Sequence, residues 1–121
     1  MTTVLIVDDS RLARDMVSGV IKSLQPEWTV VAATGGDDAL TKVAEQTPNL
    51  AILDYNMPGM DGLTLAEKLR EAHLMLPIAI LTANVQDALR RRAEDLGCWF
   101  LTKPVTADKI RDLFQKTGVA S

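Results

Sequence analysis

The sequence has little of what marks secreted, nucleic-acid-binding or membrane proteins. It contains one cysteine in 121 residues, so the disulfides typical of small secreted domains cannot form within the chain. The formal net charge is -3, whereas nucleic-acid binding favours a basic face. No apolar run approaches the length of a membrane span, and the N-terminus lacks a signal-peptide pattern. We therefore expect a cytoplasmic protein that binds neither nucleic acid nor membrane.

The composition is that of an ordinary globular domain. Hydrophobic residues make up 47% of the chain and charged residues 24%. A length of 121 residues suits one domain with one core, and no linker or low-complexity segment divides the chain. We expect a single domain over residues 1–121.

Short apolar runs alternate with segments of helical spacing along the whole chain. The expected strands cover residues 4–7, 28–33, 50–54, 77–81 and 98–101. Helical spacing is expected after each strand: over residues 12–24, from 37 to the residue before Pro48, from near Gly62 through Leu69, over about 85–96, and on Ile110, Leu113 and Phe114 as far as about Gly118. This alternation predicts βαβ units with right-handed crossovers, and hence an α/β fold in which helices cover both faces of a parallel sheet.

The third expected strand ends in a carboxylate, Asp54, and the turn-rich loop that contains Pro58-Gly59 follows at once. In open parallel sheets, ligand sites form at the carboxyl ends of the strands. A charge buried there is costly unless it is paired or bound to a metal. Asp54 is therefore either a solvent-exposed residue that caps the strand or part of a ligand site.

Other strands bring polar side chains to the same edge. The first delivers Asp8 and Asp9, the fourth Thr82 and the fifth Lys103. Three clustered carboxylates require a cation, and hard oxygen ligands suit Mg²⁺. Lysine and hydroxyl groups bond phosphoryl oxygens. The set predicts transfer of a phosphoryl group to Asp54, which would attack in line and form an acyl phosphate.

Four motifs carry a resemblance to a known family: VDD at residues 7–9, LDYNMPGMDG at 53–62, LTA at 81–83 and TKP at 102–104. In order and spacing the chain resembles the receiver domain of two-component response regulators over nearly its whole length. The resemblance implies a stand-alone, CheY-like receiver with a doubly wound, flavodoxin-like (βα)5 fold. It also implies a five-stranded parallel sheet in the order 2-1-3-4-5.

The resemblance assigns the residues of a magnesium site. It makes Asp54 the phosphoacceptor and a metal ligand, Asp9 a direct ligand of Mg²⁺, and Asp8 an acid that acts mainly through metal-bound water. The backbone carbonyl of Asn56 would complete the metal shell.

The resemblance also assigns a switch. Thr82 would be the hydroxyl that moves toward the phosphoryl group, and Phe100 the aromatic side chain that changes rotamer in response. Many relatives have tyrosine at the Phe100 position, so partner recognition through that hydroxyl is lost here. Lys103 would bind the phosphate beside a cis bond to Pro104, and Asn84 would tune the lifetime of the acyl phosphate.

The implied function is a switch without an enzymatic substrate beyond the protein's own phosphorylation and dephosphorylation. A sensor histidine kinase would donate the phosphoryl group, and a target, of chemotaxis type or another, would dock on the last two strand-helix units of a monomer. The alternatives are a phosphate sink, a receiver cut from a longer regulator, a degenerate receiver, and an aspartyl-phosphate phosphatase. A phosphatase needs an acid-base carboxylate two positions past its nucleophile, where this chain has Asn56.

Three consecutive arginines, Arg90, Arg91 and Arg92, lie on the fourth expected helix. We interpret them as a solvated helix face, with a docking patch as the alternative.

Overall fold

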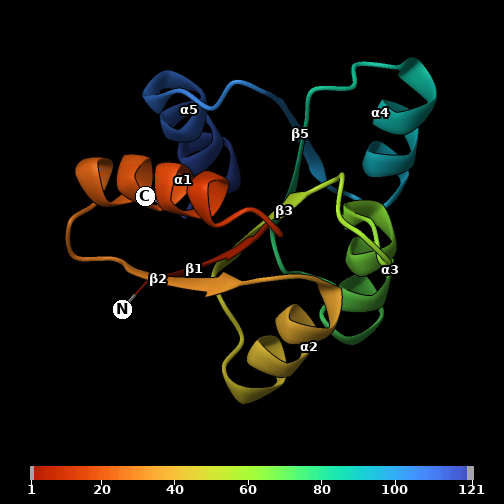
Figure 1. The fold of residues 1–121 in the computed structure, drawn as a ribbon, viewed down its shortest axis with the longest axis horizontal. Helices are drawn as coiled ribbons and strands as arrows, with labels where there is room; N and C mark the ends of the chain where they lie inside the picture. Colours follow the sequence, from red (N-terminus) through yellow and green to blue (C-terminus); the bar gives the residue numbers. More distant parts are fainter. Residues whose placement is uncertain (1, 120–121) are drawn as a thin grey trace.

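Figure 1 shows the fold in a computed structural model that describes residues 2–119. Strands and helices alternate five times, as the sequence predicts. The strands are β1 (Thr3–Val7), β2 (Thr29–Ala33), β3 (Leu50–Asp54), β4 (Ile78–Thr82) and β5 (Trp99–Thr102). The helices are α1 (Arg11–Leu24), α2 (Gly36–Glu45), α3 (Gly62–Ala72), α4 (Asp87–Asp95) and α5 (Ala107–Thr117).

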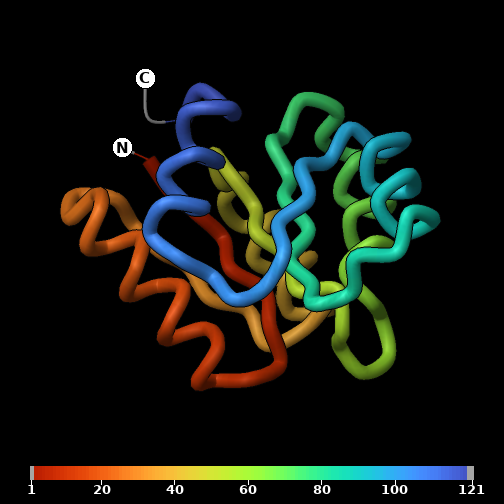
Figure 2. Tube along the Cα trace, turned by 90° about the horizontal axis from the view of Figure 1, so that it is seen from above, coloured from red at the N-terminus to blue at the C-terminus, as the bar shows by residue number. Residues whose placement is uncertain are grey.

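All neighbouring strands pair in parallel, and the sheet has the order β2-β1-β3-β4-β5. This confirms the predicted α/β class and the flavodoxin-like, CheY-like strand order. Figures 1 and 2 show α1 and α5 on one face of the sheet and α2, α3 and α4 on the other. The doubly wound arrangement leaves β1, β3 and β4 buried on both faces.

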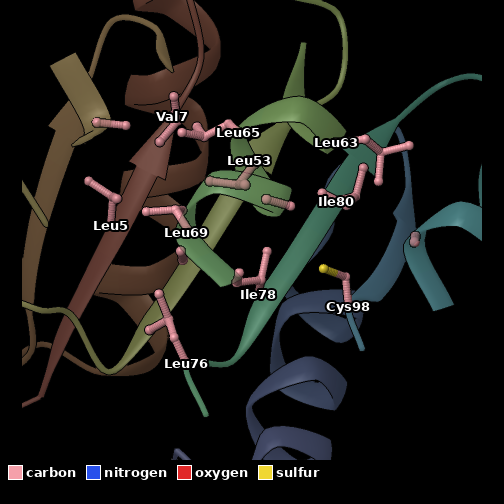
Figure 3. Close-up of a cluster of buried hydrophobic side chains, with 14 of the residues drawn as sticks. Leu5, Val7, Leu53, Leu63, Leu65, Leu69, Leu76, Ile78, Ile80 and Cys98 are labelled. Carbon is pink, nitrogen blue, oxygen red and sulfur yellow. The ribbon is translucent and has the colours of Figure 1, made fainter. Parts of the chain in front are cut away.

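Each face of the sheet has its own hydrophobic cluster, because successive side chains of a strand point to opposite faces. Leu53 and Ile80 pack with Leu65 and Leu69 of α3 on one face, as Figure 3 shows. The other face joins residues of β1, β3 and β4 to α1 and α5, and the largest fully buried side chain there is Phe114. The two clusters hold the central strands in place, and with them the residues at the strand ends.

The predicted bounds of β4, α4 and β5 differ from the structure by one or two residues, and two of the differences have a clear cause. The fourth helix begins at Asp87 instead of residue 85, because Asn84 Oδ1 accepts a hydrogen bond from the Gln86 N–H, which makes a turn of this segment. The last strand begins at Trp99 instead of residue 98, because the Cys98 N–H donates to the Ala93 carbonyl at the end of α4. The first pair of β5 is therefore Trp99 with Ala79.

Within residues 2–119, no helix combines the length and the apolar character that crossing a bilayer would need.

Candidate functional site

Three carboxylates converge at the carboxyl edge of the sheet. Asp8 and Asp9 follow β1 directly, Asp54 ends β3, and the two strands are neighbours in parallel register. One carboxylate oxygen from each residue lies within 4.8 Å of the other two. Asp8 and Asp54 are each only 4% exposed, whereas Asp9 is open to solvent. The structure thus brings Asp9 together with Asp54, which lies 45 residues later in the sequence.

Lys103 stands over this cluster from the end of β5. Its Nζ lies 2.9 Å from Asp54 Oδ1, as an ion pair between a partly exposed ammonium and a buried carboxylate. Apart from this ion pair, Asp54 Oδ1 has no hydrogen-bond partner among the described residues. A buried oxygen without a directed donor, beside two further carboxylates, fits a divalent cation with oxygen ligands.

Asp8 is fixed by the chain that follows it. Its Oδ1 accepts the Ser10 N–H at 2.9 Å, and its backbone carbonyl accepts Arg14 Nη1 at 2.7 Å. Burial raises the pKa of the Asp8 carboxyl above its ordinary value, the negative charge of Asp54 adds to the rise, and the hydrogen bond from Ser10 opposes it. Burial and the charge of Asp54 thus make ionisation of Asp8 less favourable than in a free side chain.

Ser10 also caps α1, since its side chain accepts the Ala13 N–H. Of the two polar residues directly before α1, Asp9 and Ser10, it is Ser10 that makes the cap. This leaves the carboxylate of Asp9 available to the acidic cluster.

Thr82 is fully buried at the end of β4. Its Oγ1 accepts the Asn84 N–H at 3.0 Å, and its backbone carbonyl accepts the Lys103 N–H at 2.9 Å. This places the hydroxyl and the lysine on adjacent strand ends. The Lys103–Pro104 bond is cis, as the resemblance implies.

Gly62 is a site residue that the sequence reading treated only as a helix start. It begins α3 directly beside the end of β3, where a Cβ atom would lie 2.5 Å from the backbone oxygen of Asp54. Its N–H donates to the Tyr55 carbonyl, and Asp61 caps the helix by accepting the Thr64 N–H. The Asp-Gly pair at a helix start is the sequence signal for this close approach.

Two further predicted residues, Asn56 and Phe100, are not part of the acidic cluster. Asn56 is exposed in the loop after β3, two residues beyond Asp54, and its carbonyl role stays a prediction. Phe100 is half-buried against the cluster under α3 and α4, and the Arg90 guanidinium carbon lies 5.0 Å from its ring centroid. Sequence reasoning missed the contacts of Arg90 and Arg14, because no local spacing signals either of them.

Chemically, the edge combines an anionic nucleophile, oxygen ligands for a divalent cation, a lysine ammonium and a buried hydroxyl. A phosphoryl group transferred to Asp54 would meet positive charge from Lys103 and a donor from Thr82. The site has the parts for an in-line transfer to an aspartate.

Comparison with known proteins agrees with this site. Residues 4–115 match the model of the family described as the response regulator receiver domain. The cyclic di-GMP phosphodiesterase response regulator RpfG of Xanthomonas campestris is 37% identical over 111 residues, which are 89% of this chain and 29% of that protein. The sensor protein EvgS of Escherichia coli is 40% identical over 112 residues, 90% of this chain and 9% of that one.

Among solved structures, the chemotaxis protein CheY4 of Vibrio cholerae is similar with a TM-score of 0.89 and 28% identity. The match covers 97% of this chain and 98% of that chain. The chain spans about half or less of the length of the first curated relatives that it matches.

Proposed function

Because the chain belongs to the family of response regulator receiver domains of two-component systems, we propose that it accepts a phosphoryl group from a sensor histidine kinase on Asp54. The observation that carries the proposal is the convergence of three carboxylates within 4.8 Å, with Lys103 Nζ 2.9 Å from Asp54 Oδ1. The reaction joins a carboxylate oxygen of Asp54 to phosphorus and breaks the phosphorus–nitrogen bond of the donor histidine. The imidazole leaves with the bonding pair.

Asp8, Asp9, Asp54 and the backbone carbonyl of Asn56 are the groups that would hold Mg²⁺. When bound, this ion supplies positive charge that stabilises the phosphoryl oxygens in the transition state. The same charge offsets the repulsion between the acids, which the protein alone leaves uncompensated.

Lys103 and Thr82 complete the acceptor site. The Lys103 ammonium orients the Asp54 carboxylate now and would turn to a phosphoryl oxygen after transfer. The Thr82 hydroxyl accepts the Asn84 N–H, and its own proton is free to be donated to another phosphoryl oxygen. Positioning and charge then carry the step, with no acid-base residue required.

The output surface of the proposed switch lies on α4, β5 and α5. Phosphorylation would move Thr82 toward the new anion and Phe100 with it, and a target protein would read this change. On this proposal the chain acts in the cytoplasm as a monomer and turns over no substrate besides its own acyl phosphate. A phosphate sink uses the same chemistry but has no target specific for the phosphorylated form.

The proposal is tested by incubating the protein with acetyl phosphate and Mg²⁺ and measuring its intact mass. We expect the mass gain of one phosphoryl group, lost in Asp54→Asn and in excess chelator. Asp15→Asn is the matched control, since Asp15 is an exposed acid of α1 that pairs with Arg11. Labelling that persists in Asp54→Asn would overturn the assignment of the acceptor.

A chromogenic phosphate ester separates the proposed switch from a phosphatase. The switch predicts no steady turnover of the ester. Continued release of the chromophore that depends on Asp54 would instead favour the enzyme.

A further inference from the structure

The three arginines of α4 have different surroundings. Arg92 Nη2 lies 3.4 Å from Glu67 Oε1 of α3, in an exposed ion pair. Arg90 instead places its guanidinium carbon 5.0 Å from the centroid of the Phe100 ring, within the range of a cation–π interaction. Arg91 is exposed, and no ion pair or hydrogen bond of its side chain is found among residues 2–119. One run of identical charges thus contains one ring contact, one ion pair and one solvated residue.

The ring under Arg90 lies on the same face of the sheet as Thr82. Phe100 is the direct neighbour of Ile80 across β4 and β5, and Thr82 follows Ile80 by two residues. Because side chains alternate between faces along a strand, Ile80 and Thr82 point to the same side. Phe100 therefore lies on the same face of the sheet as the buried Thr82 hydroxyl, and its ring contacts the Arg90 guanidinium of α4.

We infer that Arg90 is a positioning residue that holds Phe100 in its resting place and so opposes the switch. The inference rests on the proposed function, in which Phe100 moves toward the space left by Thr82. The attraction exists only while the ring faces the guanidinium, so the movement of Phe100 must break it. No carboxylate pairs with Arg90 among the described residues, and its charge is therefore available to the ring.

The contact between Arg90 and Phe100 should also change how tightly a ligand binds at the acceptor site. Any interaction that favours the resting state weakens the binding of a ligand that prefers the switched state by the same factor. An exposed cation–π contact changes such an equilibrium by about two- to fivefold. Removing the guanidinium should therefore tighten the binding of a phosphoryl mimic at Asp54, although Arg90 does not touch that site.

The chain offers a direct probe, since it has two phenylalanines, Phe100 and Phe114. Phe114 is 2% exposed and packs on Trp28 on the opposite face of the sheet, so its ring serves as an internal reference. Isotope-labelled phenylalanine then gives two ring spin systems in an NMR spectrum. Titration with beryllofluoride in the presence of Mg²⁺ follows the switch at Phe100 without any partner protein.

The comparison is between the wild type, Arg90→Gln and the matched control Arg91→Gln. We expect Arg90→Gln to shift the Phe100 signal already without beryllofluoride and to lower the titration midpoint by about two- to fivefold. Arg91→Gln removes the same charge from the same helix and should match the wild type. This difference separates the ring contact from a general effect of charge on α4.

The outcomes distinguish the two levels of the proposal. A wild type whose Phe100 signal responds, with the same midpoint in Arg90→Gln, overturns the positioning role alone. An equal shift in both variants also overturns it, because the effect would then be one of net charge. A wild-type Phe100 that ignores saturating beryllofluoride overturns the proposed switch itself, and the positioning role with it.

Discussion

The two ends of the sheet are built in opposite ways. At the carboxyl edge, acids of like charge are packed together, and the buried Asp54 Oδ1 has no hydrogen bond among the described residues. At the amino edge, the side chain of Arg70 saturates a set of backbone carbonyls. Its Nε donates to Leu96 at 2.9 Å and its Nη1 to Leu76 at 2.6 Å.

Further donations from the same guanidinium reach the carbonyls of Leu74, at 3.0 Å, and of Gly97, at 3.3 Å. These carbonyls belong to the segments that lead into β4 and β5, so one cation joins α3 to the beginnings of two strands. Nearby, the Thr3 N–H donates to Asn49 Oδ1 at 2.8 Å, which closes the start of β1 in the same manner.

The two edges of the sheet therefore have different roles, one in stability and the other in function. At the amino edge, the side chains of Arg70 and Asn49 bond backbone groups of the chain itself. At the carboxyl edge the acids repel one another, and on the proposed function a bound cation would relieve this repulsion and stabilise the cluster. We therefore expect substitutions of the charged side chains at the two edges to differ in sign and in their dependence on Mg²⁺.

The largest effect should come from Arg70→Ala. It leaves several carbonyls without their donor, at about 1 kcal/mol each, so the free energy of unfolding should fall by about 3 kcal/mol. Urea denaturation measures this loss, and the affinity for Mg²⁺ should stay unchanged in the folded fraction. Arg91→Ala, which removes an exposed arginine, is the control. An equal loss in both variants would show that Arg70 does not hold the amino edge together.

Gly62→Ala tests the close approach behind Asp54. The added Cβ would lie 2.5 Å from backbone rather than from a flexible side chain, so the helix must shift. We expect a loss of about 2 kcal/mol in unfolding free energy and weaker binding of Mg²⁺, because Asp54 shifts with the helix.

Gly19 provides the matched control for this substitution. It lies in α1 with no atom within 4 Å of its Cβ position, so Gly19→Ala should stabilise by up to about 1 kcal/mol. If Gly62→Ala unfolds at the same urea concentration as Gly19→Ala, the crowding behind Asp54 is too small to matter.

The sequence predicted the strands and the convergence of the acids because both follow from local signals. An apolar run such as residues 50–54 forms a buried strand, and parallel pairing brings its last residue beside those that follow β1. The acid that ends a strand is therefore placed by topology alone. The roles of these acids in phosphoryl transfer stay predictions that rest on the resemblance.

Long-range polar contacts could not be predicted in this way. Arg70 meets the Leu96 carbonyl across 26 residues, and Arg90 meets a ring on another element. Nothing in the local sequence distinguishes these arginines from others on helices, because their partners come into contact only when the chain is folded. The start of α4 was missed for a related reason, since the side chain of Asn84 competes with the helix for a backbone donor.

The smallest effect, and the one that depends most on conditions, is expected for Asp8→Asn. Without Mg²⁺ the substitution removes one charge from the acidic cluster, so the free energy of unfolding should rise by about 1 kcal/mol near neutral pH. Asp37→Asn is the control, because Asp37 is an exposed acid in the first turn of α2, where negative charge is favourable. It should be neutral or slightly destabilising.

The pH dependence follows from the raised pKa of Asp8, whose ordinary value is 3.8. The folded state holds this proton more tightly than the unfolded chain, so its stabilising contribution is complete below pH 3.8 and is lost as pH rises through the higher folded pKa. Asp8→Asn should flatten that part of the stability profile in chelator and should reduce the stabilisation by Mg²⁺. Urea unfolding at several pH values, with Mg²⁺ and with chelator, measures both. A variant that is less stable than the wild type in chelator would contradict the contrast between the two edges, since Asp8 would then stabilise the fold without a cation.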